Sequence, residues 1–317
     1  MKISRNQKCI INTDLDGVFS GLLLHNYLNW EVVGFCDSAE TIWIDKTKCN
    51  NIKDCVFVDM YLLNEDIKCI DQHIISVDDE HNKILSENDN KLNPNLLNKR
   101  NFLPNQSYYN KYPFGTAHFI IAWLEQNGVE LNINLHNKVN ENISVIDLLL
   151  RADDAFQTSC YSRYTDNAND WWKWLVSFSD DGKTSVLLSD YINKSKQYKT
   201  ESQVADIKTS ISKLLKSSPY FCNSPDGGYK NESYLGTDNL KDNVKEYISF
   251  IAEKSGLECF SLDFDFRLIK GIAKRTSLTK NQLERFKKTK LDDKILTYAF
   301  VRSSNRDDNF SYTIFEL

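Results

Sequence analysis

Short apolar segments in the first third of the chain are followed by acidic residues, a placement that suits metal chemistry. Carboxylate oxygens combined with an imidazole nitrogen favour Mn²⁺, Mg²⁺ or Zn²⁺ over an ion that prefers thiolates. The residues concerned are Asp14 and Asp16 after segment 8–13, Asp59 after segment 55–58, and Asp71 with His73 after segment 67–70.

The segments that carry these acids alternate with a helical pattern. Residues 18–28 place apolar side chains at helical spacing directly after Asp16. Strand, helix and strand in this order predict an α/β fold with a mostly parallel sheet flanked by helices. Because the carboxyl ends of parallel strands meet at one edge of a sheet, we expect the acids to lie together there.

So many like charges at one edge require cations to neutralise them. A further acidic pair, Asp153 and Asp154, follows the apolar segment 145–150 and is expected to complete the cluster. The residue types therefore predict a site for divalent cations, built from at least three carboxylates and one imidazole.

The order and spacing of these residues resemble the motifs of the DHH phosphoesterase superfamily over about the first 160 residues. Asn12-Thr-Asp-Leu-Asp-Gly-Val-Phe-Ser20 resembles the first motif, a D-x-D loop followed by a helix. Asp59 resembles the isolated aspartate of the second motif, and Asp71-Gln72-His73 resembles the D-H-H triplet. Asp153 resembles the aspartate of the fourth motif.

The resemblance implies a metal-dependent phosphoesterase, RecJ-like or oligoribonuclease-like, with two ions that are Mn²⁺ or Mg²⁺. Its substrates would be nucleic acid ends, oligonucleotides or nucleotides. Asp59 would bridge the ions, His73 and Asp71 would be catalytic, and His73 would contact the substrate phosphate. Asp154 is the alternative to Asp153. The implied metal ligands are Asp14, Asp16, Asp59 and Asp153.

The triplet departs from the family pattern at Gln72, which stands where the family has a metal-binding histidine. A glutamine carbonyl can ligate a hard ion, but it binds transition metals more weakly than imidazole does. This departure predicts a weakened second metal site.

The chain is expected to contain three parts. Residues 1–165 form a DHH-like metal-binding catalytic domain, residues 166–247 a helical connector, and residues 248–317 a small C-terminal α/β domain that binds substrate. The segment 298–303 resembles a strand with an Arg-Ser pair in the domain that often accompanies DHH domains. Arg302 and Ser303 are therefore implied substrate contacts.

Nine basic residues fall between positions 267 and 290, a stretch that we interpret in part as a basic helix. They could hold a polyanion through its phosphates. A solvated helix face is the alternative interpretation.

The composition is that of a folded chain with an acidic balance. The 317 residues include 39 Lys+Arg and 44 Asp+Glu, a formal charge of −5, and 41 % hydrophobic residues. These values exclude disorder of the whole chain and coating of nucleic acid by bulk charge. The sequence contains no apolar run near the ~18 residues of a membrane helix, so no membrane partner is expected.

The eight cysteines form no CxxC pair, and the N-terminus lacks the apolar stretch of a signal peptide. We therefore expect reduced thiols and a cytoplasmic location. A homodimer is compatible with these features.

Two other interpretations remain open. Segment 11–18 also matches the first motif of the haloacid dehalogenase superfamily, in which Asp14 would be the phosphorylated nucleophile and Asp16 the acid/base. Alternatively, Gln72 fits a catalytically impaired DHH-like protein that binds nucleotide or nucleic acid. Two bound ions would favour the enzyme, and one or none would favour the binding protein.

Overall fold

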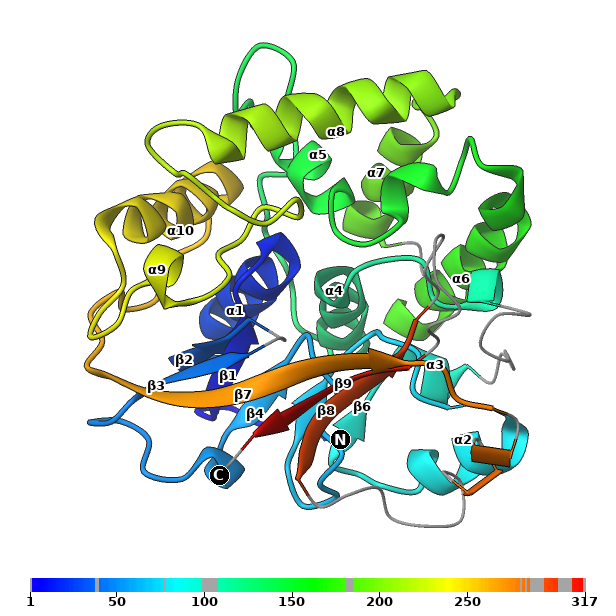
Figure 1. The fold of residues 1–317 in the computed structure, drawn as a ribbon. Coiled ribbons are helices and arrows are strands. Elements are labelled where there is room, and N and C mark those ends of the chain that lie inside the picture. The colour runs from blue at the N-terminus through cyan, green and yellow to red at the C-terminus, as the bar shows by residue number, and fades with distance from the viewer. Residues whose placement is uncertain are drawn as a thin grey trace.

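Figure 1 shows the computed structural model of the chain, an α/β fold in which helices cover one face of a large sheet. The predicted α/β class is confirmed, with a mixed sheet whose parallel strands lie at one end. The structure describes residues 2–37, 40–76, 78–98, 108–180, 185–279, 281–282, 284–285, 294–301 and 310–315.

The parallel end of the sheet contains the strands that precede the acids. Strand β1 pairs in parallel with β2 on one side and with β4 on the other, and β5 and β6 continue the sheet beyond β4. Nearly all their residues are buried, as expected for parallel strands covered on both faces. In spatial order these strands are β6 (Lys91–Leu92), β5 (Cys69–Ile70), β4 (Val56–Val58), β1 (Lys8–Asn12) and β2 (Glu31–Cys36).

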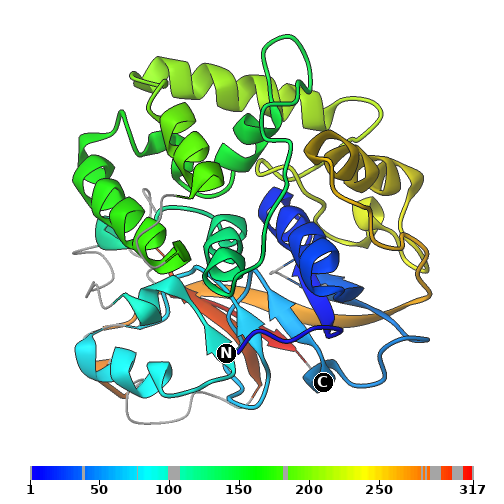
Figure 2. The same ribbon diagram turned by 180° about the vertical axis from the view of Figure 1, so that it is seen from behind.

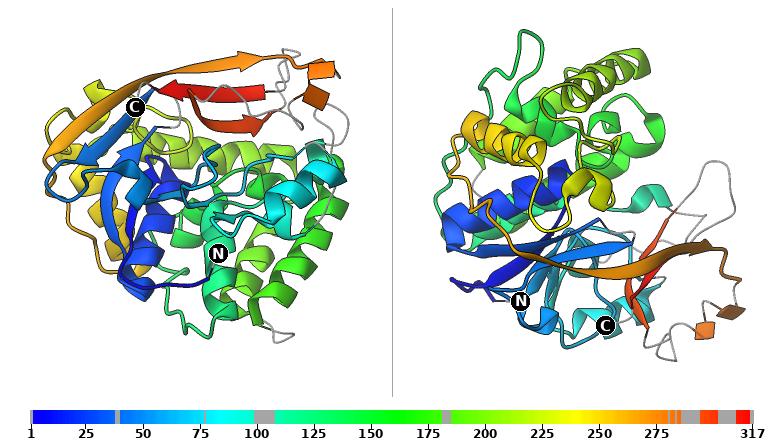
Figure 3. Two further views of the ribbon diagram at one scale, coloured as in Figure 1. Left: turned by 90° about the horizontal axis from the view of Figure 1, so that it is seen from below. Right: turned by 60° about the vertical axis from the view of Figure 1, so that its left-hand side comes forward.

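The rest of the sheet is antiparallel and includes the C-terminal strands. β3 pairs with the first half of the long strand β7, and the second half of β7 pairs with β9. Figure 3 shows β7 running along one side of the molecule with β9 next to it. The predicted smaller C-terminal domain is not confirmed, because its strands belong to the same sheet. The strands are β3 (Thr41–Asp45), β7 (Phe266–Thr276), β9 (Phe310–Phe315) and β8 (Ile295–Phe300).

The sheet curves so that its last strand, β8, returns to the loops that follow β4 and β5. Leu62 bridges to Thr297, and Ile74 bridges to Phe300. A hydrophobic core that includes Phe57 fills the space between the parallel strands and β8. Strand β8 therefore ends against the residue that follows His73.

Helices form a lobe on the other face of the sheet. Helices α1 (Leu15–Leu28) and α4 (Thr116–Gln126) pack there, and Figures 1 and 2 show further helices above them. Between positions 166 and 247 the chain is largely helical. The remaining helices and helical turns are η1 (Ile52–Asp54), α2 (Asp79–Ser86), α3 (Pro94–Leu97), η2 (Tyr108–Asn110), α5 (Val145–Leu150), η3 (Ala155–Gln157), α6 (Ser162–Asp180), α7 (Val186–Ser195), α8 (Glu201–Lys216), α9 (Glu232–Leu235) and α10 (Asp242–Ser255).

The segment 259–317 is expected to form a strand, a basic helix and two further strands. In the structure four of its basic residues, Arg267, Lys270, Lys274 and Arg275, lie on strand β7, and residues 281–282 and 284–285 after it are helical. Hydrogen bonds to β3 on one side and to β9 on the other decide the strand conformation, since strand formation depends more on neighbouring strands than on intrinsic propensity.

Within the described part of the chain, the helices are all too short or too polar to cross a membrane. All eight cysteines are free thiols, in agreement with the expectation from their spacing.

Candidate metal centre

The carboxyl edge of the parallel strands gathers the acids that the sequence places after them. Asp14 lies between β1 and α1, Asp59 directly follows β4, and Asp71 directly follows β5. Because β5, β4 and β1 are adjacent in the sheet, the three strand ends deliver their carboxylates to one place.

At this edge lies a set of three residues, Asp59, Asp71 and His73, which we name the histidine group. Each offers one ligand atom, and the three atoms lie within 4.8 Å of one another. Asp71 Oδ1 lies 2.7 Å from Nδ1 of His73, and Asp71 Oδ2 accepts a hydrogen bond from the His73 backbone N–H at 3.0 Å. With Nδ1 held by Asp71, Nε2 is the ring nitrogen that can contact an ion or a substrate.

The charge of His73 is controlled by the same contact. Burial would lower the pKa of His73, but the Asp71 carboxylate raises this pKa to about 9. In the absence of a cation the ring is therefore positively charged at neutral pH. Binding of a metal ion through Nε2 requires a neutral ring and releases that proton.

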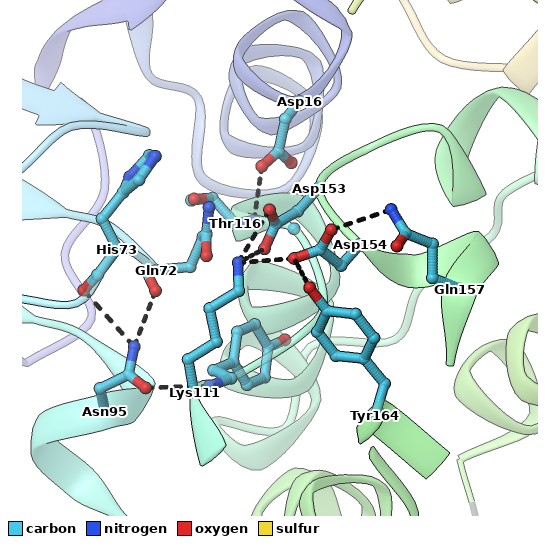
Figure 4. Close-up of polar contacts among 12 residues, drawn as sticks. Asp16, Gln72, His73, Asn95, Lys111, Thr116, Asp153, Asp154, Gln157 and Tyr164 are labelled. Atoms are coloured by element: carbon cyan, nitrogen blue, oxygen red, sulfur yellow. Dashed lines mark hydrogen bonds and ion pairs between the residues drawn. The ribbon is translucent and has the colours of Figure 1, made fainter. Parts of the chain in front are cut away.

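Two asparagines fix the loop that carries the histidine group. Asn93 donates its side-chain N–H to Asp71 Oδ2 at 3.1 Å, and Asn95 donates to the backbone carbonyl of Gln72 at 2.7 Å. The Gln72 side chain is buried, and its Oε1 has no hydrogen-bond partner among the described residues. Figure 4 shows Gln72 pointing into the space between His73 and Lys111. An unpaired buried amide oxygen is costly, which favours a ligand or water in this space.

Asp59 has an uncommon backbone conformation. Its φ is +65°, in the left-handed region that aspartate and asparagine tolerate better than most other residues. Its carboxylate accepts hydrogen bonds from Asn12 Nδ2 at 2.9 Å and from the Thr116 hydroxyl at 2.7 Å. Burial, together with the carboxylates of Asp16 and Asp14, raises the pKa of Asp59 well above its ordinary value. Such strain and charge repulsion are typical of functional sites.

The two acids of the first motif have different partners. Asp14 caps α1 by accepting a hydrogen bond from the Gly17 N–H at 3.1 Å. Asp16 accepts hydrogen bonds from the N–H groups of Thr116 and Ala117 at 2.7 and 2.8 Å, so it holds the N-terminus of α4. Sequence reasoning missed this second role of Asp16, which joins two helices 100 residues apart.

Both acids are harder to ionise than ordinary aspartates. Burial and the neighbouring Asp16 raise the pKa of Asp14 to about 7. Burial raises the pKa of Asp16 to about 6, against the effect of its two backbone donors. A divalent cation at this edge would lower these raised pKa values, because it would stabilise the ionised carboxylates.

The predicted pair Asp153 and Asp154 is engaged by a lysine that the sequence did not indicate. Lys111 Nζ lies 3.0 and 2.7 Å from the two carboxylate oxygens of Asp153 and 3.0 Å from Oδ2 of Asp154 (Figure 4). We name these three residues the lysine group. Asp154 also accepts hydrogen bonds from Gln157 at 3.1 Å and from the Tyr164 hydroxyl at 3.3 Å.

The lysine group and the histidine group interact electrostatically. Burial raises the pKa of Asp153 to about 6, while Lys111 and His73 both oppose that rise. Asp153 in turn contributes to the raised pKa of His73. Figure 4 shows His73 and the lysine group facing the same region, in agreement with this interaction.

A loop from the helical lobe lies against the first motif. A Cβ atom on Gly228 would lie 2.5 Å from the Cα of Asp14, so this close approach requires glycine. The neighbouring Asp226 pairs with the buried Arg151 at 2.9 Å. The sequence suggested only a turn at this position, because the partner segment is more than 200 residues away.

The described residues thus bring the predicted acids and His73 together at one edge. Arg302 and Ser303, the predicted substrate contacts, lie outside the described residues. The histidine group fits a hard divalent cation, since it combines two carboxylates and an imidazole beside the unpaired oxygen of Gln72.

Comparison of the chain with protein-family models, with curated proteins and with solved structures gives no match.

Proposed function

We propose that this chain is a metal-dependent phosphoesterase of the DHH type, which hydrolyses phosphodiester bonds in nucleic acid ends, oligonucleotides or nucleotides. The observation that carries the proposal is the histidine group, whose three ligand atoms lie within 4.8 Å of one another at the carboxyl edge of the sheet. The motif resemblance at Asp14, Asp16, Asp59 and the Asp71-Gln72-His73 triplet supports the same reaction class.

Each residue of the histidine group has a role in this proposal. Asp59 and His73 hold the cation, Mn²⁺ or Mg²⁺, and Asp71 orients His73 through the 2.7 Å contact to Nδ1. When bound, the cation would acidify a water molecule and offset the negative charge of a phosphoryl group. Thr116 and Asn12 hold the Asp59 carboxylate in place.

The basic residues of β7 support an anionic substrate. Exposed basic residues of β7, such as Lys274 and Arg275, provide a positive surface for the phosphates of a longer strand.

The test is a hydrolysis assay with Mn²⁺ on labelled single-stranded DNA and RNA, short oligonucleotides and cyclic dinucleotides. Asp59→Asn is the test variant, because asparagine tolerates the left-handed backbone at this position. Asp89→Asn, at an exposed aspartate, is the matched control. We expect cleavage by the wild type and the control, and no cleavage by Asp59→Asn.

Other outcomes would redirect the assignment. Hydrolysis that survives Asp59→Asn but not Asp14→Asn would support the haloacid dehalogenase interpretation. That interpretation needs room for a flap after the first motif, whereas α1 already includes Asp16 and Gly17. Tight binding of an oligonucleotide without cleavage would support the non-catalytic binding protein.

A further inference from the structure

We propose that Lys111 takes the place of a second metal ion, so that the site binds one divalent cation at the histidine group. This inference rests on the proposed function and goes beyond it, since it sets the number of ions and assigns a role to a residue outside the motifs. The observation behind it is the geometry of the lysine group.

The ammonium group of Lys111 is surrounded by carboxylate oxygens. Its nitrogen has three N–H donors, and three oxygens of Asp153 and Asp154 lie at 2.7–3.0 Å. The Lys111 side chain is only 6 % exposed. A metal ion bound by Asp153 would have to displace this ammonium group from both oxygens of that carboxylate.

The position of Lys111 is fixed by contacts on both sides. Its backbone carbonyl accepts a hydrogen bond from Asn167 Nδ2 at 2.8 Å, and the carbonyl of Asn110 accepts one from the indole N–H of Trp171 at 2.9 Å. On the other side, the Tyr112 N–H donates to Asn95 Oδ1 at 3.0 Å. These anchors, two of which come from α6, hold the lysine at the acidic pair.

Among the described residues, the space between the histidine group and the lysine group (Figure 4) also lacks a strong metal ligand. Gln72 stands where the resembling family has a metal-binding histidine, and its carbonyl oxygen is a weaker ligand for Mn²⁺ than imidazole. Gln72 and Lys111 both disfavour the binding of a second metal ion. The ammonium group of Lys111 occupies the oxygens of Asp153 and Asp154 and offsets one of their two negative charges. The histidine group keeps its ligand atoms within 4.8 Å of one another for a divalent ion.

The test measures the number of Mn²⁺ ions per chain, by calorimetric titration and by metal analysis after gel filtration. The wild type is expected to bind one ion. Lys111→Met, which removes the charge at similar length, is expected to bind two, because Asp153 and Asp154 become available. The matched control is Lys83→Met at an exposed lysine, which should bind one ion.

The metal-free proteins provide a second readout. Without Lys111 the acidic pair is left without its cation, so the melting temperature of metal-free Lys111→Met should fall by about 10 °C. Added Mn²⁺ should reverse the loss.

Asp153→Asn keeps the test decisive if Lys111→Met does not fold. Asparagine suits the positive φ of 48° at this position. The proposal predicts one ion in this variant and an Mn²⁺ affinity within about threefold of the wild type, because only a screened charge is removed. Two ions in the wild type and one ion in Asp153→Asn would overturn the proposal.

The outcomes separate this inference from the proposed function. Two ions in the wild type, or one ion in Lys111→Met, would overturn the role of Lys111 and leave a metal-dependent enzyme standing. No ion in the wild type would contradict the metal-dependent function itself. By ion number alone, a single ion would favour the non-catalytic binding protein, so ion number and activity are measured on the same preparation. A single ion accompanied by cleavage supports both proposals.

Discussion

The histidine group and the lysine group lie at the same edge of the sheet, and each contains two aspartates. In the first, Asp59 and Asp71 share the space with an imidazole whose Nε2 can contact an ion. In the second, Asp153 and Asp154 are occupied by the ammonium group of Lys111. The acids of one group can accept a divalent cation, and those of the other already have a cation from the chain.

The difference shows that a cluster of carboxylates does not by itself predict the number of metal ions. Like charges at a sheet edge must be offset, and a lysine of the chain can supply part of the positive charge that a metal ion would otherwise supply. The identity of the neutralising group depends on which side chain reaches the acids. The following predictions test whether the two groups differ in this way.

The largest effect is expected for Asp59→Asn in the histidine group. Loss of an anionic ligand should lower kcat/KM at least about 1,000-fold. The same change should stabilise the metal-free protein by about 1–2 kcal/mol, because it removes a buried charge whose folded pKa is well above 3.8. Urea unfolding in EDTA measures this gain. A variant that keeps wild-type turnover would contradict the assignment of Asp59.

A smaller effect, on the affinity for Mn²⁺, is expected for Asp71→Asn. This change leaves the ligand nitrogen of His73 in place but removes the carboxylate that orients the ring. Mn²⁺ affinity should fall about 10- to 100-fold. Because the Asp71 carboxylate holds the pKa of His73 at about 9, this pKa should fall toward its ordinary value of about 6.5. NMR titration of the metal-free protein measures the change.

The matched control for this variant is Asp190→Asn, which breaks the exposed pair between Asp190 and His136. The titration of His73 should not change in the control. An unchanged His73 pKa in Asp71→Asn would show that another group supplies the charge.

Gln72→His should sharpen the comparison further. An imidazole in place of the unpaired amide oxygen should tighten Mn²⁺ binding by about tenfold or raise turnover. Gln157→His, next to Asp154 of the lysine group, should change neither, since Lys111 already occupies the oxygens of these acids. Calorimetric titration measures both variants. No change in Gln72→His would show that position 72 does not face the ion.

The smallest effect concerns the pH dependence of the metal-free protein. The folded pKa values of Asp14, Asp16 and Asp153 are raised to about 7, 6 and 6 from 3.8. The native state therefore holds more protons than the unfolded state above pH 4. The free energy of unfolding should therefore fall as pH rises from 4 to 7, because these carboxyl groups hold their extra protons less favourably as pH rises over this range.

The raised pKa of His73 acts in the same direction up to about pH 9. Bound Mn²⁺ should oppose the fall in the free energy of unfolding above pH 6, because the ion favours the ionised acids. Urea titrations at several pH values, with EDTA or with Mn²⁺, measure both curves. A free energy of unfolding that rises from pH 4 to 7 in EDTA would contradict the proposed burial of these acids.

Much of the parallel end could be predicted from the sequence. The strands β1, β4 and β5 appear as short apolar segments, and the pattern of strand, helix and strand predicts that their carboxyl ends meet. The convergence of Asp14, Asp59 and Asp71 follows from that topology. The pairing of the strand at 266–276 with β3 could not be predicted in this way, because it joins residues more than 200 positions apart.

The sequence by itself determined the local features: which segments are apolar enough to form buried strands, and which acids follow them. Tertiary structure decided which partners those acids have. Asp16 reaches the N-terminus of α4, 100 residues away, and Asp153 meets Lys111, 42 residues away. The physical reason is that hydrophobic periodicity acts over a few residues, whereas ion pairs and hydrogen bonds between distant segments form only after the sheet and helices pack together.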